Sequence, residues 1–257
     1  MNNLTSIIVS TYNKEEYLYL CLKSLLFQTN MNFEVIVADD GSGPQTKAIV
    51  EYFKDNGLNI LHEWHEDLGF RKTEILNKAI KKSNGEYIVF LDGDCFVQPH
   101  FIQKHLDLRE QNVLITGSRI LLNHKITKKI IKQKEIFDIS LFIKYSFFYR
   151  LDGSINKFLQ LWIHLPANFL RIYKYYSWRR IKGCNLSMWK KDLELVGYFN
   201  EQLRGWGHED SDLVFRMHIK GIKRKSGAWA TEVFHLWHTP ADRYNAESNF
   251  RAILKSQ

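Results

Sequence analysis

Residues 87–95 read Tyr-Ile-Val-Phe-Leu-Asp-Gly-Asp-Cys, and this stretch decides the fold that the rest of the chain must fit. β-Branched and aromatic residues cluster in it directly after the turn signal Asn84-Gly85, so we expect a buried strand over its apolar part. Asp92 and Asp94 follow at the carboxyl end of this strand, where open α/β sheets bind ligands. The glycine between them lets the backbone bend, so the two carboxylates can hold a divalent cation beside a phosphate. A solvated turn after a strand is the alternative.

Apolar strands alternate with amphipathic helices over the first 92 residues. This alternation predicts βαβ units and an α/β fold, with a Rossmann-like, mostly parallel central sheet flanked by helices. The loops at 11–13, 39–42 and 92–94 then meet at one edge of the sheet, which favours a ligand site there. We expect strands over residues 6–10, 33–38 and 60–62, and helices over residues 15–28, 46–54 and 73–82.

The composition is that of one large globular domain with a strong positive charge. The 257 residues are 45% hydrophobic and 25% charged, and the net charge is +8. A basic chain suits a polyanionic partner, although general lysine enrichment gives the same balance. The first strand is followed neither by the glycine fingerprint of a dinucleotide fold nor by a Gly-Lys-Ser/Thr phosphate loop. This argues against an NAD dehydrogenase and a P-loop ATPase.

Three features predict a cytoplasmic protein. No stretch reaches the roughly 18 to 20 apolar residues that a membrane span needs. No secretory signal precedes the first strand. The cysteines are odd in number, scattered and without metal-ligand spacing, which suits free thiols in a reducing cytosol. They are Cys21, Cys95 and Cys184.

Between residues 123 and 182 the alternation stops, and aromatic and basic residues mix. We interpret this segment as a helical insertion. Basic aromatic helices can lie on anionic membrane surfaces, so peripheral contact with the inner face of the cytoplasmic membrane is one interpretation. The other is that the aromatic side chains form the core of an inserted helical layer. The basic residues form two clusters, Lys125, Lys128, Lys129, Lys132 and Lys134, and Arg171, Lys174, Arg179, Arg180 and Lys182.

The last segment is dense in polar residues. Glu209 and Asp210 fall in the first turn of an expected helix, where carboxylates complement the helix dipole. The preceding Gly-Trp-Gly at 205–207 predicts a mobile loop. Ordering such a loop costs conformational entropy and exposing its tryptophan is unfavourable, unless Trp206 covers a ligand. We expect strands over residues 183–188 and 233–238 and helices over 189–196 and 213–219.

Two histidines, His235 and His238, lie in the last expected strand. A histidine near a strand end is more often a hydrogen-bonded core residue than a metal ligand. Here the chain also offers a pair of aspartates with no third protein ligand, and imidazole nitrogen is a common metal ligand. A metal role for one of the histidines therefore gains support.

Seven motifs in order, which cover nearly the whole chain except 123–182, resemble the family 2 glycosyltransferases with the A-type (GT-A) fold. More narrowly, the chain is similar to a bacterial branch whose C-terminal half is like galactosyltransferases and chondroitin polymerases. The resemblance implies one GT-A domain over 1–257, with a nucleotide-sugar-binding half at 1–122, a basic-aromatic insertion at 123–182 on the acceptor or membrane side, and an acceptor-binding and catalytic half at 183–257. The motifs are Ser-Thr-Tyr-Asn at 10–13, Asp-Asp-Gly-Ser at 39–42, Leu-Gly-Phe-Arg at 68–71, Leu-Asp-Gly-Asp at 91–94, Gly-Cys-Asn-Leu-Ser at 183–187, Gly-Trp-Gly-His-Glu-Asp at 205–210 and Phe-His-Leu-Trp-His at 234–238.

The resemblance implies a role for each matching residue. Asp94 coordinates Mn²⁺ or Mg²⁺ with His235, or with His238 as a substitute, and Asp210 is the catalytic base. Family members often carry Arg-Asn where this chain has Leu76-Asn77, a departure that removes one possible phosphate contact. Either Arg71, which matches an arginine near the diphosphate or the sugar, becomes more important, or the donor pose differs. The donor nucleotide is bound by Thr11, Tyr12, Asn13, Asp40, Arg71, Asp92 and Gly93, with Asp40 on the uracil and Asp92 on the ribose, and the sugar or acceptor is bound by Asn185, Trp206, Gly207 and Glu209.

The implied function is inverting, metal-dependent transfer of a hexose or N-acetylhexosamine from a UDP-sugar to a glycan hydroxyl. The acceptor is a glycan or lipid-linked glycan, in lipopolysaccharide, O-antigen or capsule biosynthesis. No nucleic-acid partner is expected, because the chain has no recognisable nucleic-acid-reading motif. The alternative is a non-catalytic protein that binds a nucleotide sugar or a polyanion.

Overall fold

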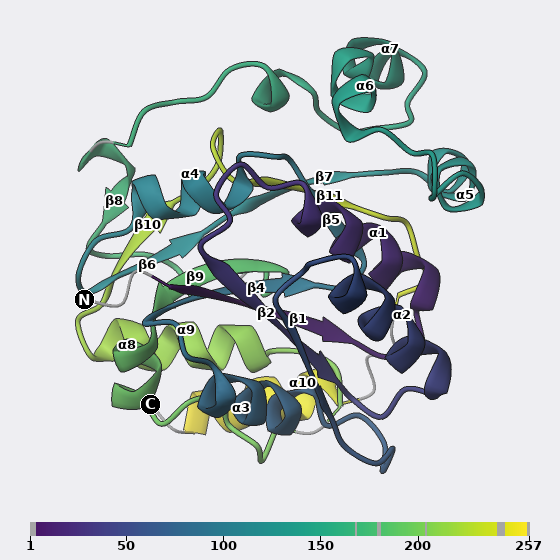
Figure 1. Cartoon of the computed structure of the whole chain (residues 1–257). Coiled ribbons are helices and arrows are strands. Elements are labelled where there is room, and N and C mark those ends of the chain that lie inside the picture. The colour runs from purple at the N-terminus through teal and green to yellow at the C-terminus, as the bar shows by residue number, and fades with distance from the viewer. Residues whose placement is uncertain (1–3, 168, 179–180, 204, 241–244, 256–257) are drawn as a thin grey trace.

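Two β-sheets form the frame of the chain in the computed structural model, which describes residues 4–167, 169–178, 181–203, 205–240 and 245–255 (Figure 1). The large sheet has the order β3 (Ile60–Trp64), β2 (Phe33–Asp39), β1 (Thr5–Thr11), β4 (Tyr87–Asp92), β9 (Asn185–Trp189), β6 (Val113–Thr116), β10 (Lys223–Ser226) and β8 (Ile172–Tyr173). The small sheet has the order β5 (Cys95–Val97), β11 (Glu232–His235) and β7 (Ser118–Leu121).

The register of the large sheet collects polar side chains at one edge. β1 pairs in parallel with both β2 and β4, and β2 pairs in parallel with β3. Thr11 therefore lies opposite Asp39, and Ser10 lies opposite Asp92. The predicted, mostly parallel α/β sheet is confirmed, with β9 as an antiparallel strand between β4 and β6.

Helices cover both faces of the large sheet (Figure 1). Successive strand residues point to opposite faces, so Ile7 and Val9 join one apolar cluster while Ile8 joins the other. One face carries α1 (Glu15–Leu26), α2 (Pro44–Asp55) and α4 (Phe101–Leu108), and the other carries α3 (Lys72–Lys82), α8 (Lys190–Leu195), α9 (Glu209–Ile219) and α10 (Ala246–Lys255).

A third apolar cluster joins the insertion to the small sheet. Phe142 packs edge-on against Phe234 and stacks on Tyr149, and Phe234 in turn stacks on Phe96. The aromatic residues of the insertion are therefore partly core. Others, among them Phe148, stay exposed. The helices of this region are α5 (His124–Lys132), α6 (Ile139–Lys144) and α7 (Ser146–Leu151), followed by two short 3₁₀ turns, η1 (Leu159–Leu161) and η2 (Phe169–Arg171).

The structure corrects several predicted boundaries. The expected strand over 233–238 ends at His235, because the Leu236 N–H turns to the carbonyl oxygen of Asp94 and the Trp237 N–H to the Thr127 hydroxyl. The expected helix over 15–28 ends at Leu26. The insertion is helical only in part, since beyond α7 it is mostly irregular and contributes β8 to the large sheet. Arg179 and Arg180 lie outside the described residues.

The thiols of all three cysteines are free and buried, as predicted. Among the described residues, no helix is both long enough and apolar enough to cross a membrane.

Replacement of Phe234 by alanine should destabilise the fold, because this fully buried ring joins the small sheet to the insertion. The free energy of unfolding should fall by about 3 to 5 kcal/mol, the usual cost of a buried Phe-to-Ala change. Phe27 is 60% exposed, so Phe27→Ala should change the free energy of unfolding by no more than about 0.5 kcal/mol. Urea unfolding followed by circular dichroism measures both, and equal losses would contradict this assignment of the core.

Candidate active site

Asp94 meets two histidines just beyond the carboxyl end of β4. Its Oδ1 atom lies 3.6 Å from Nε2 of His235, and its Oδ2 atom lies 3.1 Å from Nε2 of His238. His235 is brought there by β11, which pairs with β5 so that His235 lies opposite Cys95. His238 arrives through the turn that follows β11. The structure thus brings together the three residues that the sequence analysis assigned to a metal, although their role as ligands stays a prediction.

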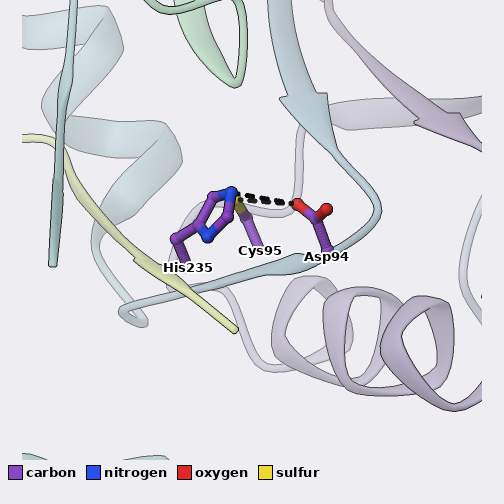
Figure 2. A group of neighbouring side chains, drawn as sticks. All are labelled: Asp94, Cys95 and His235. Atoms are coloured by element: carbon purple, nitrogen blue, oxygen red, sulfur yellow. Dashed lines mark hydrogen bonds and ion pairs between the residues drawn. The ribbon is translucent and has the colours of Figure 1, made fainter. Parts of the chain in front are cut away.

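Figure 2 shows a donor set that adds Cys95 to the residues predicted from the sequence. Asp94, Cys95 and His235 offer a carboxylate oxygen, a sulfur and an imidazole nitrogen, all within 4.8 Å of one another. Burial raises the pKa of the Cys95 thiol well above its usual value. A carboxylate with an imidazole suits Mn²⁺ better than Mg²⁺, which prefers oxygen ligands alone. The side chains present therefore fit a bound Mn²⁺.

The charge on Asp94 is held by cationic neighbours. Burial by itself would raise the pKa of Asp94, but the hydrogen bond with His238 and the charges of His235 and Lys14 hold that pKa well below its usual range. The Lys14 ammonium lies 3.2 Å from Oδ2. The pKa of His238 is raised by its bond to Asp94, whereas burial lowers the pKa of His235. Asp94 is therefore an ionised carboxylate at neutral pH.

Asp92 points to a different set of partners. Its Oδ1 atom accepts hydrogen bonds from the Ser10 hydroxyl at 2.7 Å and from the Lys72 ammonium at 2.9 Å. Gly93 allows this close approach of the two strands, because a Cβ atom there would lie 3.0 Å from the carbonyl oxygen of Ser10. The two aspartates of the motif are thus separated into two environments, one with Lys72 and one with the histidines.

The edge of β2 carries a second acidic pair, and each of its carboxylates is bound to a histidine. Asp39 is fully buried beside His62, with 2.8 Å between Oδ2 and Nε2. Asp40 lies 2.7 Å from Nε2 of His65 and accepts the N–H of Arg71 at 2.9 Å. Burial raises the pKa of Asp40, although the hydrogen bonds with His65 and Arg71 act to lower it. No sequence motif predicts a role for either histidine.

The loop after β1 lies beside this pair. The Tyr12 hydroxyl donates to Asp67, and Asn13, at a φ of 47°, bonds to the 42–43 turn through its own N–H and side-chain oxygen. The Thr11 hydroxyl oxygen is buried with no hydrogen-bond partner among the described residues. Thr11, Tyr12, Asn13 and Asp40 therefore border one region, and the binding of a nucleotide base there stays a prediction.

Arg71 and Lys72, at the start of α3, have different partners, and a role for Arg71 near the diphosphate stays a prediction. The Arg71 guanidinium donates to the carbonyl of Glu66 and pairs with Glu74 at 3.2 Å, so its charge is turned to its own helix and loop. Lys72, the next residue, faces Asp92. Burial would lower the pKa of Lys72, but the carboxylates of Asp92, Asp210 and Glu209 raise it.

Asp210 stands across a narrow cleft from Asp92. The cleft is lined by residues that include Ser10, Lys72 and Gly183. Asp210 accepts the N–H of Gly183 at 2.8 Å, and only glycine fits there, since a Cβ atom would lie 2.1 Å from Oδ1. Burial, reinforced by Glu209, raises the pKa of Asp210 to about 7, despite the opposing charge of Lys72. A carboxylate with such a pKa can accept a proton near neutral pH.

The Gly-Trp-Gly loop precedes Asp210 and is anchored at Gly207. The N–H of Gly207 donates to Glu209 at 3.0 Å, and its carbonyl accepts from the Asn249 side chain of α10 at 2.9 Å. Gly207 has a φ of +115°, a region that favours glycine. Trp206 is 38% exposed beside these contacts. Its role as a cover for the sugar stays a prediction.

Asn185 is placed differently from the other predicted sugar-binding residues. Its side chain is 1% exposed, its Oδ1 atom accepts from Nε2 of His105 at 3.1 Å, and its amide nitrogen donates to the carbonyl oxygens of Ser118 and Thr231. Its amide is therefore used to join β9 to the small sheet. A direct sugar contact by this residue stays a prediction.

Two family models match this chain. One, described as glycosyl transferase family 2, matches residues 6–180. The other, described as the N-terminal domain of galactosyltransferase, matches residues 164–239. Together they cover both the strand-edge aspartates and the segment with Asp210 and His235.

Individual relatives agree with these models. The chain is 29% identical over 231 residues to a chondroitin synthase of Escherichia coli, a match that covers 86% of this chain and 33% of the relative. It is similar in fold to S. aureus TarS 1-349 in complex with UDP-GlcNAc, with a TM-score of 0.65 and 18% identity over 97% of this chain and 65% of that one. GalNAc-T7 with UDP, GalNAc and Mn²⁺ also has a TM-score of 0.65, at 13% identity over 98% of this chain and 47% of that one. The chain thus spans about a third of the chondroitin synthase.

Proposed function

This chain belongs to glycosyl transferase family 2, and we propose that it transfers a hexose or N-acetylhexosamine from a UDP-sugar to a hydroxyl of a glycan acceptor, with inversion at the sugar carbon. The observation that carries the proposal is the placement of Asp210. Its carboxylate, with a pKa raised to about 7, lines the same narrow cleft as Asp92. Asp92 is the last residue of β4, at the edge of the sheet where the nucleotide is proposed to bind. A base and a leaving-group site therefore face one small space.

The donor is proposed to lie along the edges of β1, β2 and β4. Thr11, Tyr12 and Asp40 border the region for the uracil, and Asp92 lies where a ribose hydroxyl can bond to it. The UDP-GlcNAc in the TarS complex and the UDP in the GalNAc-T7 structure support a UDP-sugar as the donor. Asn13, Gly93 and Arg71 shape this edge through the contacts described above.

Asp94 and His235, with His238 as a substitute, would hold a divalent cation beside the diphosphate. The Mn²⁺ in the GalNAc-T7 structure supports a divalent cation as the cofactor. A cation bound there would supply a Lewis acid that stabilises negative charge on the leaving diphosphate.

The protein's own residues complete the transfer. Asp210 takes the proton of the attacking hydroxyl while the new bond forms at the sugar C1 atom and the bond from C1 to the diphosphate oxygen breaks. Attack from the face opposite the leaving group inverts the anomeric centre and needs no covalent enzyme intermediate. Lys72 keeps Asp92 in place and offsets the carboxylates around it, and Trp206 with Glu209 borders the sugar.

The insertion over 123–182 is proposed to face a lipid-linked acceptor on an anionic membrane, consistent with a role in lipopolysaccharide, O-antigen or capsule biosynthesis. The insertion carries both exposed apolar side chains and the exposed lysines of α5, a combination that suits anionic lipid surfaces. These side chains include Ile136, Leu141, Phe147, Phe148, Leu151 and Trp162.

Asp94→Asn should weaken Mn²⁺-dependent binding of UDP, because the amide keeps the shape but loses the charge. Loss of a residue that hydrogen-bonds to a metal ligand typically lowers the affinity for the metal by about 10- to 100-fold. Loss of the ligand itself should therefore lower the Mn²⁺-dependent affinity for UDP by at least about tenfold. Calorimetric titration of UDP with and without Mn²⁺ measures this. Asp55→Asn, an exposed change of the same kind on α2, should leave the affinity unchanged. Equal UDP affinity in both variants would reject Asp94 as a ligand.

Asp210→Asn should retain UDP binding and lose about 10² to 10⁴ in turnover, the usual contribution of a general base. The amide can still accept the Gly183 N–H, so folding is preserved. Because the base acts deprotonated and its pKa is raised to about 7, wild-type kcat/KM should rise with pH and level off above about 7. UDP release over a pH series measures both effects. Near-normal turnover in the variant would remove Asp210 from the role of base.

Charge reversal of Lys128, Lys129 and Lys132 to glutamate should weaken association with vesicles that contain an anionic phospholipid. Each lysine near such a surface contributes about 1 kcal/mol, so the triple variant should lose most of the bound fraction. Co-sedimentation with anionic and with neutral vesicles measures this.

The matched control reverses three exposed lysines elsewhere, Lys47, Lys54 and Lys191, and so makes the same change in net charge. Its binding to the anionic vesicles should fall much less. If both triple variants lose binding equally, the attraction depends on net charge alone, and the assignment of α5 to the membrane is wrong.

A further inference from the structure

A polar cavity lies between the small sheet and the start of β9. None of the charged side chains that line it has a role in the proposed transfer. Its volume is about 270 Å³. This is close to the lower end of ligand pockets, roughly 300 Å³, and so suits a single sugar unit. Its wall includes Ser118, Arg119, Asn156, Lys157, Lys182 and Cys184.

The charged side chains that line the cavity are all positive: Arg119, Lys157 and Lys182. Lys157 is fixed at the wall, with its ammonium 2.5 Å from the Ser118 hydroxyl oxygen. Burial lowers the pKa of Lys157, an effect that the charge of Glu232 opposes. Glu232 itself is 1% exposed, accepts the N–H of Trp229 and is not among the described residues that line the cavity.

The cavity adjoins both reactive groups of the proposed transferase. Arg119 pairs in register with Val233 of β11, two residues before His235, and its charge contributes to the lowered pKa of His235. On the other side, Cys184 lines the cavity and contacts Cys95 through its thiol. Gly183, next to Cys184, donates its N–H to Asp210. A sugar in the cavity would thus lie close to both the metal residues and the base.

We propose that this cavity binds the acidic group of a charged sugar, a uronic acid or a sugar phosphate, that takes part in the transfer. The inference rests on the proposed function and names the substrate class of that same site. A guanidinium matches a carboxylate or phosphate with two parallel hydrogen bonds, and ammonium groups strengthen that pairing. Partly buried cations gain most from such a partner, because water solvates them poorly.

The acidic sugar has two sources, the donor and the acceptor. In the donor arm, calorimetry compares UDP-glucuronate with UDP-glucose in the presence of Mn²⁺. In the acceptor arm, protein saturated with Mn²⁺ and UDP is titrated with methyl β-glucuronide, glucose 6-phosphate and neutral methyl β-glucoside. In one arm the acidic probe should bind at least about tenfold tighter than its neutral counterpart, as expected for charged hydrogen bonds.

Arg119→Gln and Lys157→Gln should each abolish most of that preference and leave the affinity for UDP itself unchanged. Lys182→Gln, at an exposed position, gives a third variant that perturbs the fold least. Lys54→Gln, on α2 and outside the lining of the cavity, is the matched control and should keep the full preference. Retained UDP binding also shows that each variant is folded.

The outcomes separate this inference from the function on which it rests. If UDP binds with Mn²⁺ but no acidic probe is preferred in either arm, the inference is overturned and the transferase proposal stands. If the Arg119 and Lys157 variants lose UDP affinity, the cations serve the diphosphate, and the inference is again overturned. If the wild type does not bind UDP with Mn²⁺, both proposals fail.

Discussion

The site depends on one constraint: carboxylates at the edge of a parallel sheet lie where little water reaches them, so each needs a positively charged or hydrogen-bonding partner. Asp39 has His62, Asp40 has His65, Asp92 has Lys72 and Asp94 has His238. A buried charge that loses its partner is strongly destabilising. The partners come from β3, the loop after it, α3 and the turn after β11, so the edge holds its shape only when the whole frame is folded.

The two sheets meet at this edge, and that meeting brings distant parts of the chain into one site. β4 ends in Asp92, and β11 returns more than a hundred residues later to place His235 beside Asp94. The Leu236 N–H donates to the Asp94 carbonyl at 3.0 Å, which ties the two segments together. α9 then presents Asp210 to the same cleft.

Lys72 connects the nucleotide edge to the base. It pairs directly with Asp92, and the charges of Asp210 and Glu209 also act on it. Its positive charge in turn opposes the rise in the pKa of Asp210. A change of charge at the nucleotide edge is therefore felt at the base, so donor binding and proton transfer share one electrostatic network.

The sequence predicted the parts of the structure that carry strong local signals. β1, β2 and β4 are continuous apolar runs with turn residues at their ends, and the motif at 91–94 identified the acidic edge. The strands β5, β6 and β7 have three or four residues each, too few for a clear pattern. His62, His65 and Lys72 were missed for another reason, since their partners are set by strand register and helix packing rather than by spacing in the chain. The insertion divides into core and exposed aromatics because only some of its side chains reach the small sheet.

The anomeric form of the released sugar tests the central claim most directly. A UDP-sugar that the protein turns over in Mn²⁺ can be followed by proton NMR in the first minutes, before the free sugar equilibrates between anomers. With Asp210 activating a nucleophile on the face opposite the diphosphate, an α-linked donor should first give the β-anomer. First release of the α-anomer would contradict the single-displacement arrangement of base and leaving group.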